Sequence, residues 1–167
     1  MIIGGVGGGA TAAARARRLN EHAEIVLFER GAFISFANCG LPYYIGDIIK
    51  KRQDLFVTTP QDFSDRYAVD VRVFSEVTAI DRSAKTVTVK DLISGETYAE
   101  TYDKLLLAPG AEPVRPPLAG TDVKNIFTLR NIPDMDGIKA YVDQHTPESA
   151  VGNGRESGAS GRRRYHH

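Results

Sequence analysis

The stretch Met1-Ile2-Ile3-Gly4-Gly5-Val6-Gly7-Gly8-Gly9 sets three apolar residues directly before a run of glycines. Residues 10–19, which follow, are rich in Ala and Arg, and Ala and Arg favour a helix. We therefore expect a strand, a tight glycine turn and a helix. This order suits a dinucleotide, because glycines let the backbone approach a pyrophosphate and the N-terminus of a helix faces its negative charge.

An apolar stretch at residues 24–30 predicts the second strand and ends in Glu29 and Arg30. Glu29 lies 25 residues after Gly4, where a carboxylate can accept hydrogen bonds from a ribose of the nucleotide. Read as G-x-G-x-x-G, the glycine pattern is incomplete, because Val6 takes the place of the second glycine. A glycine-rich turn without a nucleotide is the alternative, but the surrounding strands, helix and acid favour dinucleotide binding.

The middle of the chain combines one short helix with several strands. Thr59 and Pro60 are typical of an N-cap and a first helical turn, so a helix is expected to about Tyr67. Short β-branched runs separated by turn residues then predict a meander, and a continuous apolar run is typical of a strand buried on both faces. The expected strands are 69–74, 76–80, 86–89, 96–102, the buried 102–108 and 126–129, and a surface helix is expected at 133–145.

Composition and charge exclude several classes of protein. The 167 residues are 25% charged and 42% hydrophobic, which suits one domain with a core. Equal numbers of basic and acidic residues, 21 each, give no sign of a nucleic-acid or membrane partner. The chain shows no apolar run of the ~20 residues that a membrane span needs, no signal peptide and no metal-ligand spacing among its four histidines. A cytoplasmic location is therefore expected.

The composition changes near residue 150. We expect a domain at 1–149, whereas Gly, Ser, Arg and Asn dominate 150–167 and predict a disordered or aberrant tail.

Cys39 is the only cysteine in the chain, so it cannot form an internal disulfide, which fits a reducing compartment. Gly40 and Pro42 follow it and favour the start of a helix. A thiol attacks as its thiolate, and a helix N-terminus is one place that favours this form. The alternative is that Cys39 is a small buried hydrophobic residue.

Taken together, five stretches in order resemble the pyridine nucleotide-disulphide oxidoreductases: 4–11, 28–30, 35–43, 102–111 and 127–130. Within that family, residues 1 to about 148 look most like the coenzyme A-disulfide reductase group, a single-cysteine branch near NADH peroxidase and NADH oxidase. The resemblance implies an α/β, Rossmann-like FAD-binding domain, truncated here, in which a parallel sheet with a βαβ unit is joined to a β-meander. It also implies an enzyme in which FAD, reduced by NADH or NADPH, passes electrons to the cysteine.

The resemblance also assigns roles to individual residues. Cys39 matches the redox nucleophile of the family, and the remaining matches fall into two groups. Those that match the FAD contacts are Gly4, Gly5, Val6, Gly7, Gly8, Gly9, Glu29, Arg30, Pro109 and Gly110. Those that match the coenzyme A contacts are Thr11, Arg15, Arg18, Ser35 and Asn38. Without the resemblance, the arginines would be interpreted as a solvated helix face.

Tyr44 occupies the place where double-cysteine relatives carry their second thiol, five residues after the first. A lone thiolate that attacks a disulfide stops at a mixed disulfide, which reducing electrons from elsewhere must break. The resulting hypothesis is a Cys39–S–S–coenzyme A intermediate formed from coenzyme A disulfide or a related substrate.

Beyond about residue 149 the resemblance ends, whereas the family continues with an NAD(P)H-binding domain, the rest of the FAD domain and a dimerisation domain that makes full-length relatives homodimers. Residues 152–158 contain glycines but lack a preceding buried strand. Three alternatives therefore stay open: a peroxidase or oxidase that uses a cysteine sulfenic acid, a coenzyme A persulfide reductase, or an inactive nucleotide-binding fragment.

Overall fold

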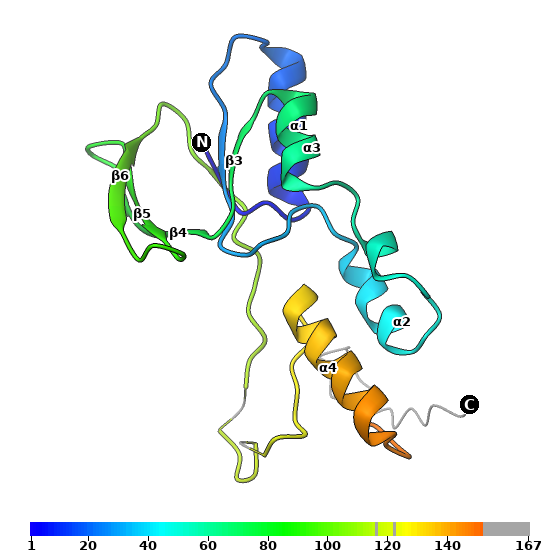
Figure 1. Ribbon diagram of the computed structural model, residues 1–167. Coiled ribbons are helices and arrows are strands. Elements are labelled where there is room, and N and C mark those ends of the chain that lie inside the picture. The colour runs from blue at the N-terminus through cyan, green and yellow to red at the C-terminus, as the bar shows by residue number, and fades with distance from the viewer. Residues whose placement is uncertain (116, 122, 152–167) are drawn as a thin grey trace, which may run out of the picture.

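Two small sheets and a set of helices make up the computed structural model, which describes residues 1–115, 117–121 and 123–151 (Figure 1). One sheet is parallel, with strand order β3-β2-β1-β7, and the other is an antiparallel meander, β4-β5-β6. This architecture confirms the predicted Rossmann-like class with a β-meander. The predicted tail lies outside the described residues from 152 onward.

The parallel sheet is built around β1 (Ile2–Ile3), which pairs with β2 (Val26–Phe28) on one side and with β7 (Leu106–Leu107) on the other. Parallel strands need a crossover connection, and α1 (Gly8–Leu19) supplies it between β1 and β2. In the same way, α3 (Pro60–Tyr67) leads into β3 (Asp70–Arg72).

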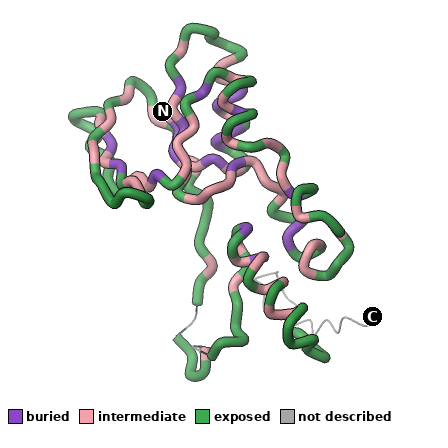
Figure 2. Tube along the Cα trace, in the orientation of Figure 1, coloured by how far each residue is buried: buried purple, intermediate pink, exposed green. Residues whose placement is uncertain are grey.

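Small side chains let α1 lie close to the sheet. Ala10, Ala13 and Ala14 are buried on one face of α1, where they pack with Leu27 of β2 and Phe63 of α3. The predicted helix at 60–67 is confirmed, and the side chain of its N-cap, Thr59, accepts a hydrogen bond from the Asp62 N–H at 3.0 Å. Figure 2 shows buried residues on α1 and on the neighbouring strands.

The prediction of a strand buried on both faces at 102–108 is wrong. The structure has only the short β7 there, and its side chains are 38% exposed at Leu106 and 59% exposed at Leu107. Within the described ranges, β1 is the only strand that pairs with β7, so its other edge is open. The continuous apolar run indicated a strand, but it did not reveal how many neighbours the strand has.

Two further strand predictions need correction. Residues 126–129 form no strand and run as irregular chain. The stretch 69–74, expected in the meander, instead pairs as β3 with β2, in register Leu27↔Val71. Phe74 has a positive φ of 52°, which turns the chain from one sheet into the other.

The meander consists of β4 (Ser75–Asp81), β5 (Thr86–Asp91) and β6 (Thr97–Thr101). Val87 and Val89 of β5 are buried against Phe28 of β2, which joins the two sheets. In each of the two hairpin turns, an aspartate side chain accepts hydrogen bonds from N–H groups of the turn. The Ser83 hydroxyl, with the Ala84 and Ser83 N–H groups, lowers the pKa of Asp81, and the Ser94 and Ile93 N–H groups lower that of Asp91.

A helical unit lies apart from the sheets, where α4 (Ile132–His145) packs on α2 (Leu41–Ile45). Two short 3-10 turns, η1 (Asn38–Gly40) and η2 (Arg52–Leu55), flank α2. The predicted helix at 133–145 is confirmed, but it is no simple surface helix, because Ile132 and Met135 are fully buried. Their partners Leu41 and Leu55 come from the cysteine-bearing segment and from η2.

Candidate functional site

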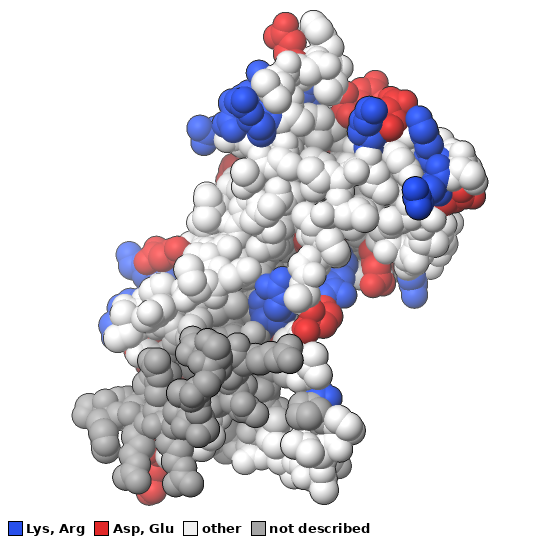
Figure 3. Space-filling view, turned by 180° about the vertical axis from the view of Figure 1, so that it is seen from behind, with Lys and Arg blue, Asp and Glu red and all other residues white. Residues whose placement is uncertain are grey.

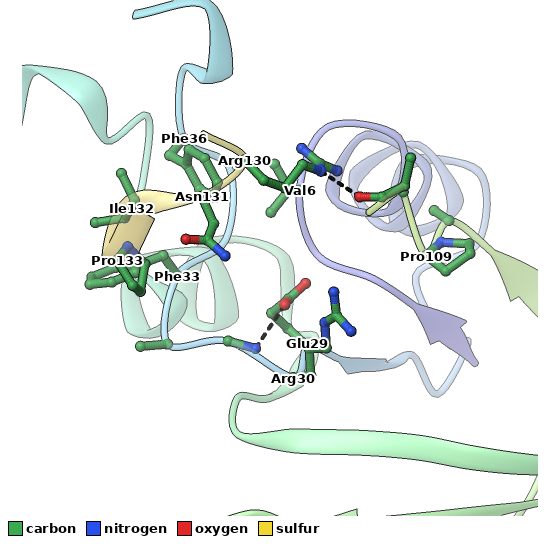
Figure 4. Close-up of a pocket in the computed structure, with 15 residues that line it drawn as sticks. Val6, Glu29, Arg30, Phe33, Phe36, Pro109, Arg130, Asn131, Ile132 and Pro133 are labelled. Atoms are coloured by element: carbon green, nitrogen blue, oxygen red, sulfur yellow. Dashed lines mark hydrogen bonds between the residues drawn. The ribbon is translucent and has the colours of Figure 1, made fainter. Parts of the chain in front are cut away.

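A hollow of about 130 Å³ lies where β1, β2 and β7 end and α4 begins (Figure 4). Full ligand pockets measure roughly 300–1,000 Å³, so this hollow has room for only part of a dinucleotide. Ligands of open parallel sheets bind beyond the carboxyl ends of the strands, which is where the hollow lies. It is lined by Val6, Glu29, Arg30, Gly31, Ala32, Phe33, Phe36, Ala108, Pro109, Gly110, Ala111, Arg130, Asn131, Ile132 and Pro133.

One side of the hollow is the glycine wall, the loop of residues 4–9. Gly4 has a φ of +96°, and a Cβ on it would overlap the carbonyl oxygen of Ala108. A Cβ on Gly9 would overlap the carbonyl oxygen of Gly4. The first turn of α1 carries no acidic residue and no side-chain cap, so its unpaired N–H groups remain available for an anion. The wall therefore fits the close approach of a pyrophosphate.

Glu29 follows β2 and ties the glycine wall to the second strand. Its Oε2 accepts a hydrogen bond from the Gly5 N–H at 2.8 Å, and its Oε1 accepts one from the Gly31 N–H at 2.8 Å. A carboxylate oxygen can accept two hydrogen bonds, so each oxygen keeps one position for a ribose hydroxyl. The structure thus gives Glu29 a role in holding the loop, and its contact with a ribose stays a prediction.

The other side is the helical wall: Asn131, Ile132 and Pro133 at the start of α4, with Phe33 and Phe36 facing them (Figure 4). Asn131 and Asp134 form a capping box, in which Asn131 accepts from the Asp134 N–H at 2.9 Å. Sequence reasoning gave none of the residues of this wall a site role. The pattern Asn-x-x-Asp, which is typical of a capping box, could have shown that α4 begins after Asn131.

Arg130 is a further residue of the hollow that sequence reasoning missed. Its Nε donates to the Ala111 carbonyl oxygen at 2.7 Å, and its guanidinium lies against Gly110, where a Cβ would collide with it. Nearby, Arg30 forms an ion pair with Glu112, which joins the loops after β2 and β7. Two guanidinium groups therefore stand at the hollow, and such groups bind phosphates well.

The structure brings only part of the predicted FAD set to the hollow. Val6, Glu29, Arg30, Pro109 and Gly110 line it, whereas Gly4, Gly5, Gly7, Gly8 and Gly9 form the loop and helix start that carry Val6. Binding of FAD by these residues stays a prediction.

Cys39 is exposed in η1, directly before α2, so the alternative of a buried hydrophobic residue is wrong. Its segment is anchored on both sides of Phe36. The Ser35 N–H donates to the Gly5 carbonyl oxygen at 3.2 Å, and the Ala37 N–H donates to the Leu55 carbonyl oxygen at 2.8 Å. Cys39 does not line the hollow, but Ser35 links its segment to the glycine wall.

Thr11, Arg15 and Arg18 all lie exposed on α1, at a spacing that places them on one face. Arg17 differs, because it donates to the carbonyl oxygens of Tyr67 at 2.9 Å and Ala68 at 2.7 Å and so secures α1 to the end of α3. Of the residues predicted to contact coenzyme A, Asn38 is exposed next to Cys39 and Ser35 is half-buried.

On the face shown in Figure 3, basic and acidic side chains are interspersed over the described part of the molecule. Among the described residues, no three His, Cys, Asp or Glu side chains gather in a way that could hold a metal ion. In the same part of the chain, no helix is both long and apolar enough to cross a membrane.

Known proteins similar to this chain include coenzyme A disulfide reductases and an NADH oxidase. A coenzyme A disulfide reductase of Staphylococcus haemolyticus is 42% identical over 90% of this chain and 34% of its own. The structure of reduced CoADR-RHD from Bacillus anthracis is 53% identical, with a TM-score of 0.88 over 90% of this chain and 27% of that one. The NADH-bound, water-forming NADH oxidase of Lactobacillus brevis is 29% identical, with a TM-score of 0.81 over 86% of this chain and 32% of that one.

This chain thus spans about a third of the length of the relatives it matches. The model of the family described as pyridine nucleotide-disulphide oxidoreductase matches residues 1–154. Its members are FAD-dependent enzymes that use NAD(P)H. Since that match takes in nearly all of the sequence, the chain belongs to the pyridine nucleotide-disulphide oxidoreductase family.

Proposed function

We propose that this chain is the FAD-holding and cysteine-bearing part of an oxidoreductase that reduces coenzyme A disulfide, or a related coenzyme A-linked disulfide or persulfide, with NAD(P)H. The observation that carries the proposal is the link between two elements. An exposed, single cysteine lies on a segment hydrogen-bonded through Ser35 to Gly5 of the glycine wall. The similarity to proteins named coenzyme A disulfide reductase supports the substrate.

The residues of the hollow fit FAD. The glycine wall leaves no room for a Cβ at Gly4 or Gly9, the helix start carries no acid, and Glu29 keeps acceptor positions for a ribose. Arg30, Pro109 and Gly110 would complete the contacts predicted from the sequence. When bound, FAD supplies the two electrons, taken from NAD(P)H, that reduce the disulfide formed at Cys39.

Cys39 acts as the nucleophile in this proposal. Its thiolate attacks one sulfur of coenzyme A disulfide, forms the Cys39–S–S–coenzyme A bond and releases the first coenzyme A thiolate. Because Tyr44 stands where a second thiol would be, the mixed disulfide persists until two electrons cleave it and release the second coenzyme A thiolate. Exposure of Cys39 leaves room for a substrate as large as coenzyme A.

Recognition of coenzyme A would involve the exposed face of α1. Arg15 and Arg18 present guanidinium groups that can pair with phosphates, and Thr11 lies on the same face. Ser35 and Asn38 would contact the substrate near the sulfur, because both lie shortly before the cysteine in the chain.

The second candidate is a peroxidase or oxidase in which Cys39 forms a sulfenic acid, and the similarity to the Lactobacillus brevis NADH oxidase favours it. A third reading, a fragment that binds nucleotide without turnover, is favoured by the exposed Leu106 and Leu107 on the open sheet edge.

The test combines a flavin titration with mass spectrometry. We expect the purified chain to quench FAD fluorescence on binding and, after incubation with coenzyme A disulfide, to gain one coenzyme A adduct on the Cys39 peptide. The variant Cys39→Ser should still bind FAD and gain no adduct. A sulfinic or sulfenic acid at Cys39 without an adduct would favour the peroxidase or oxidase. FAD binding with neither an adduct nor an oxidised Cys39 would leave the fragment that binds nucleotide without turnover, and no FAD binding would contradict the proposed function.

A further inference from the structure

Arg52 lies in η2, outside the hollow, yet it has partners on two sides. Its Nε donates to Oδ1 of Asp136 at 2.8 Å, and a terminal nitrogen donates to Oδ2 of the same carboxylate at 2.7 Å. The guanidinium carbon also lies 5.4 Å from the ring centroid of Phe33 and 5.2 Å from that of Phe56. The hydrogen bonds to Asp136 raise the pKa of Arg52, so it stays charged throughout the physiological range.

Both partners lead to the helical wall. Asp136 lies one turn into α4, whose first residues Ile132 and Pro133 line the hollow, and Phe33 lines the hollow beside them (Figure 4). The segment that carries Arg52 reaches the cysteine as well, because Leu55 of η2 accepts a hydrogen bond from the Ala37 N–H. The Arg52 side chain therefore joins α4 to Phe33, and the turn that carries it is hydrogen-bonded to the segment before Cys39.

We propose that Arg52 is a positioning residue for the hollow: by holding Asp136 and Phe33 together it fixes the place of the helical wall. The proposal rests on the proposed function only in taking the ligand of the hollow to be FAD. A lysine could not replace Arg52 here, because only the planar guanidinium can bind a carboxylate in two places and lie against aromatic rings at once.

Lys139 offers a matched control on the same helix. Its Nζ lies 3.0 Å from Asp47 and 2.7 Å from Asp143, so it also joins α4 to the segment after α2. Lys139 and its partners do not line the hollow. Loss of this ion pair should therefore loosen α4 without moving the helical wall.

The test compares wild type, Arg52→Lys and Lys139→Gln by amide hydrogen exchange without FAD and by fluorescence titration with FAD. In Arg52→Lys we expect faster exchange in residues 31–37 and 130–136 together, no change in β4–β6, and an FAD dissociation constant raised about tenfold. Lys139→Gln should leave the exchange of residues 31–37 and, within about twofold, the dissociation constant unchanged. Asp136→Asn keeps the shape of the partner and should show the same changes in exchange and in the FAD dissociation constant. It replaces Arg52→Lys in the test if the lysine variant fails to fold.

Two results would overturn the proposal. One is unchanged exchange at 31–37 and 130–136 in both Arg52→Lys and Asp136→Asn. The other is faster exchange spread evenly through β4–β6 as well, which would make Arg52 a general stabilising residue. If the wild-type chain binds no FAD, the proposed function fails, but the exchange data still decide the role of Arg52.

Discussion

The two walls of the hollow are built in opposite ways. The glycine wall is held by main-chain contacts, in which Gly4 and Gly9 approach neighbouring carbonyl groups so closely that no Cβ fits. The helical wall is held by side chains that meet across long stretches of sequence, such as Arg52 and Asp136, 84 residues apart. At Gly4 and Gly9 the backbone tolerates no added atom, whereas a wall made of side chains should weaken by degrees. The following changes test that difference.

The largest effect on stability is expected from one substitution, glycine to alanine, made in the glycine wall and, for comparison, in the helix that carries the helical wall. Gly9→Ala would force the new Cβ into the Gly4 carbonyl, so we expect a loss of about 4 kcal/mol or more in the free energy of unfolding. Gly137→Ala in α4 has open space around it and should instead stabilise by about 1 kcal/mol. Urea denaturation measures both. Similar values for the two variants would contradict the difference between the walls.

Met135→Ala should cost about 3 kcal/mol of unfolding free energy, because Met135 is fully buried between α4 and α2 and the cavity would not close completely. Gln144→Ala, at an exposed position of α4, gives a control near zero. Thermal unfolding of the two variants measures the contrast. A loss below about 1 kcal/mol for Met135→Ala would mean that the side-chain core does not hold the helical wall.

Glu29→Gln should lower the free energy of unfolding by a smaller amount, about 2 kcal/mol. It removes the charge that strengthens two hydrogen bonds from the Gly5 and Gly31 N–H groups. The side-chain shape is preserved, but the amide nitrogen of glutamine cannot accept a hydrogen bond, so the variant loses one of the two hydrogen bonds together with the charge. Urea denaturation gives the stability and FAD titration gives the affinity. Unchanged stability would show that the glycine wall holds itself without the carboxylate.

Acid should lower the stability of the protein least of these changes, and it should act on the meander rather than on either wall. Hydrogen bonds lower the pKa of Asp81 and Asp91 below the ordinary 3.8, so their contribution to stability is present above that pH and is lost as pH falls through the lowered values. The urea midpoint should therefore decline below pH 4. Asp91→Asn should show a shallower decline, and equal slopes would contradict this assignment.

Sequence patterns predicted the helices and strands that depend on residues close together in the sequence. Glycines, helix-forming residues and the N-cap Thr59 placed α1 and α3, and alternating residues placed the strands of the meander. The same patterns could not tell that β3 pairs with β2 or that β7 has an open edge, because strand propensity does not specify partners. The sequence did not reveal the roles of Arg52 and Arg130 for a related reason, because the groups that they contact are distant in the sequence.

The shortness of β7 should protect the chain from aggregation. Open sheet edges with apolar side chains are where separate molecules add strand to strand, and in the described part of the chain Leu106 and Leu107 form such an edge. Yet the strand has only two residues, the charged pair Asp103-Lys104 lies just before it, and Pro109, which has no N–H to donate, lies just after it. An incoming strand would find few hydrogen bonds there, so this edge favours brief, reversible contacts over the growth of fibrils.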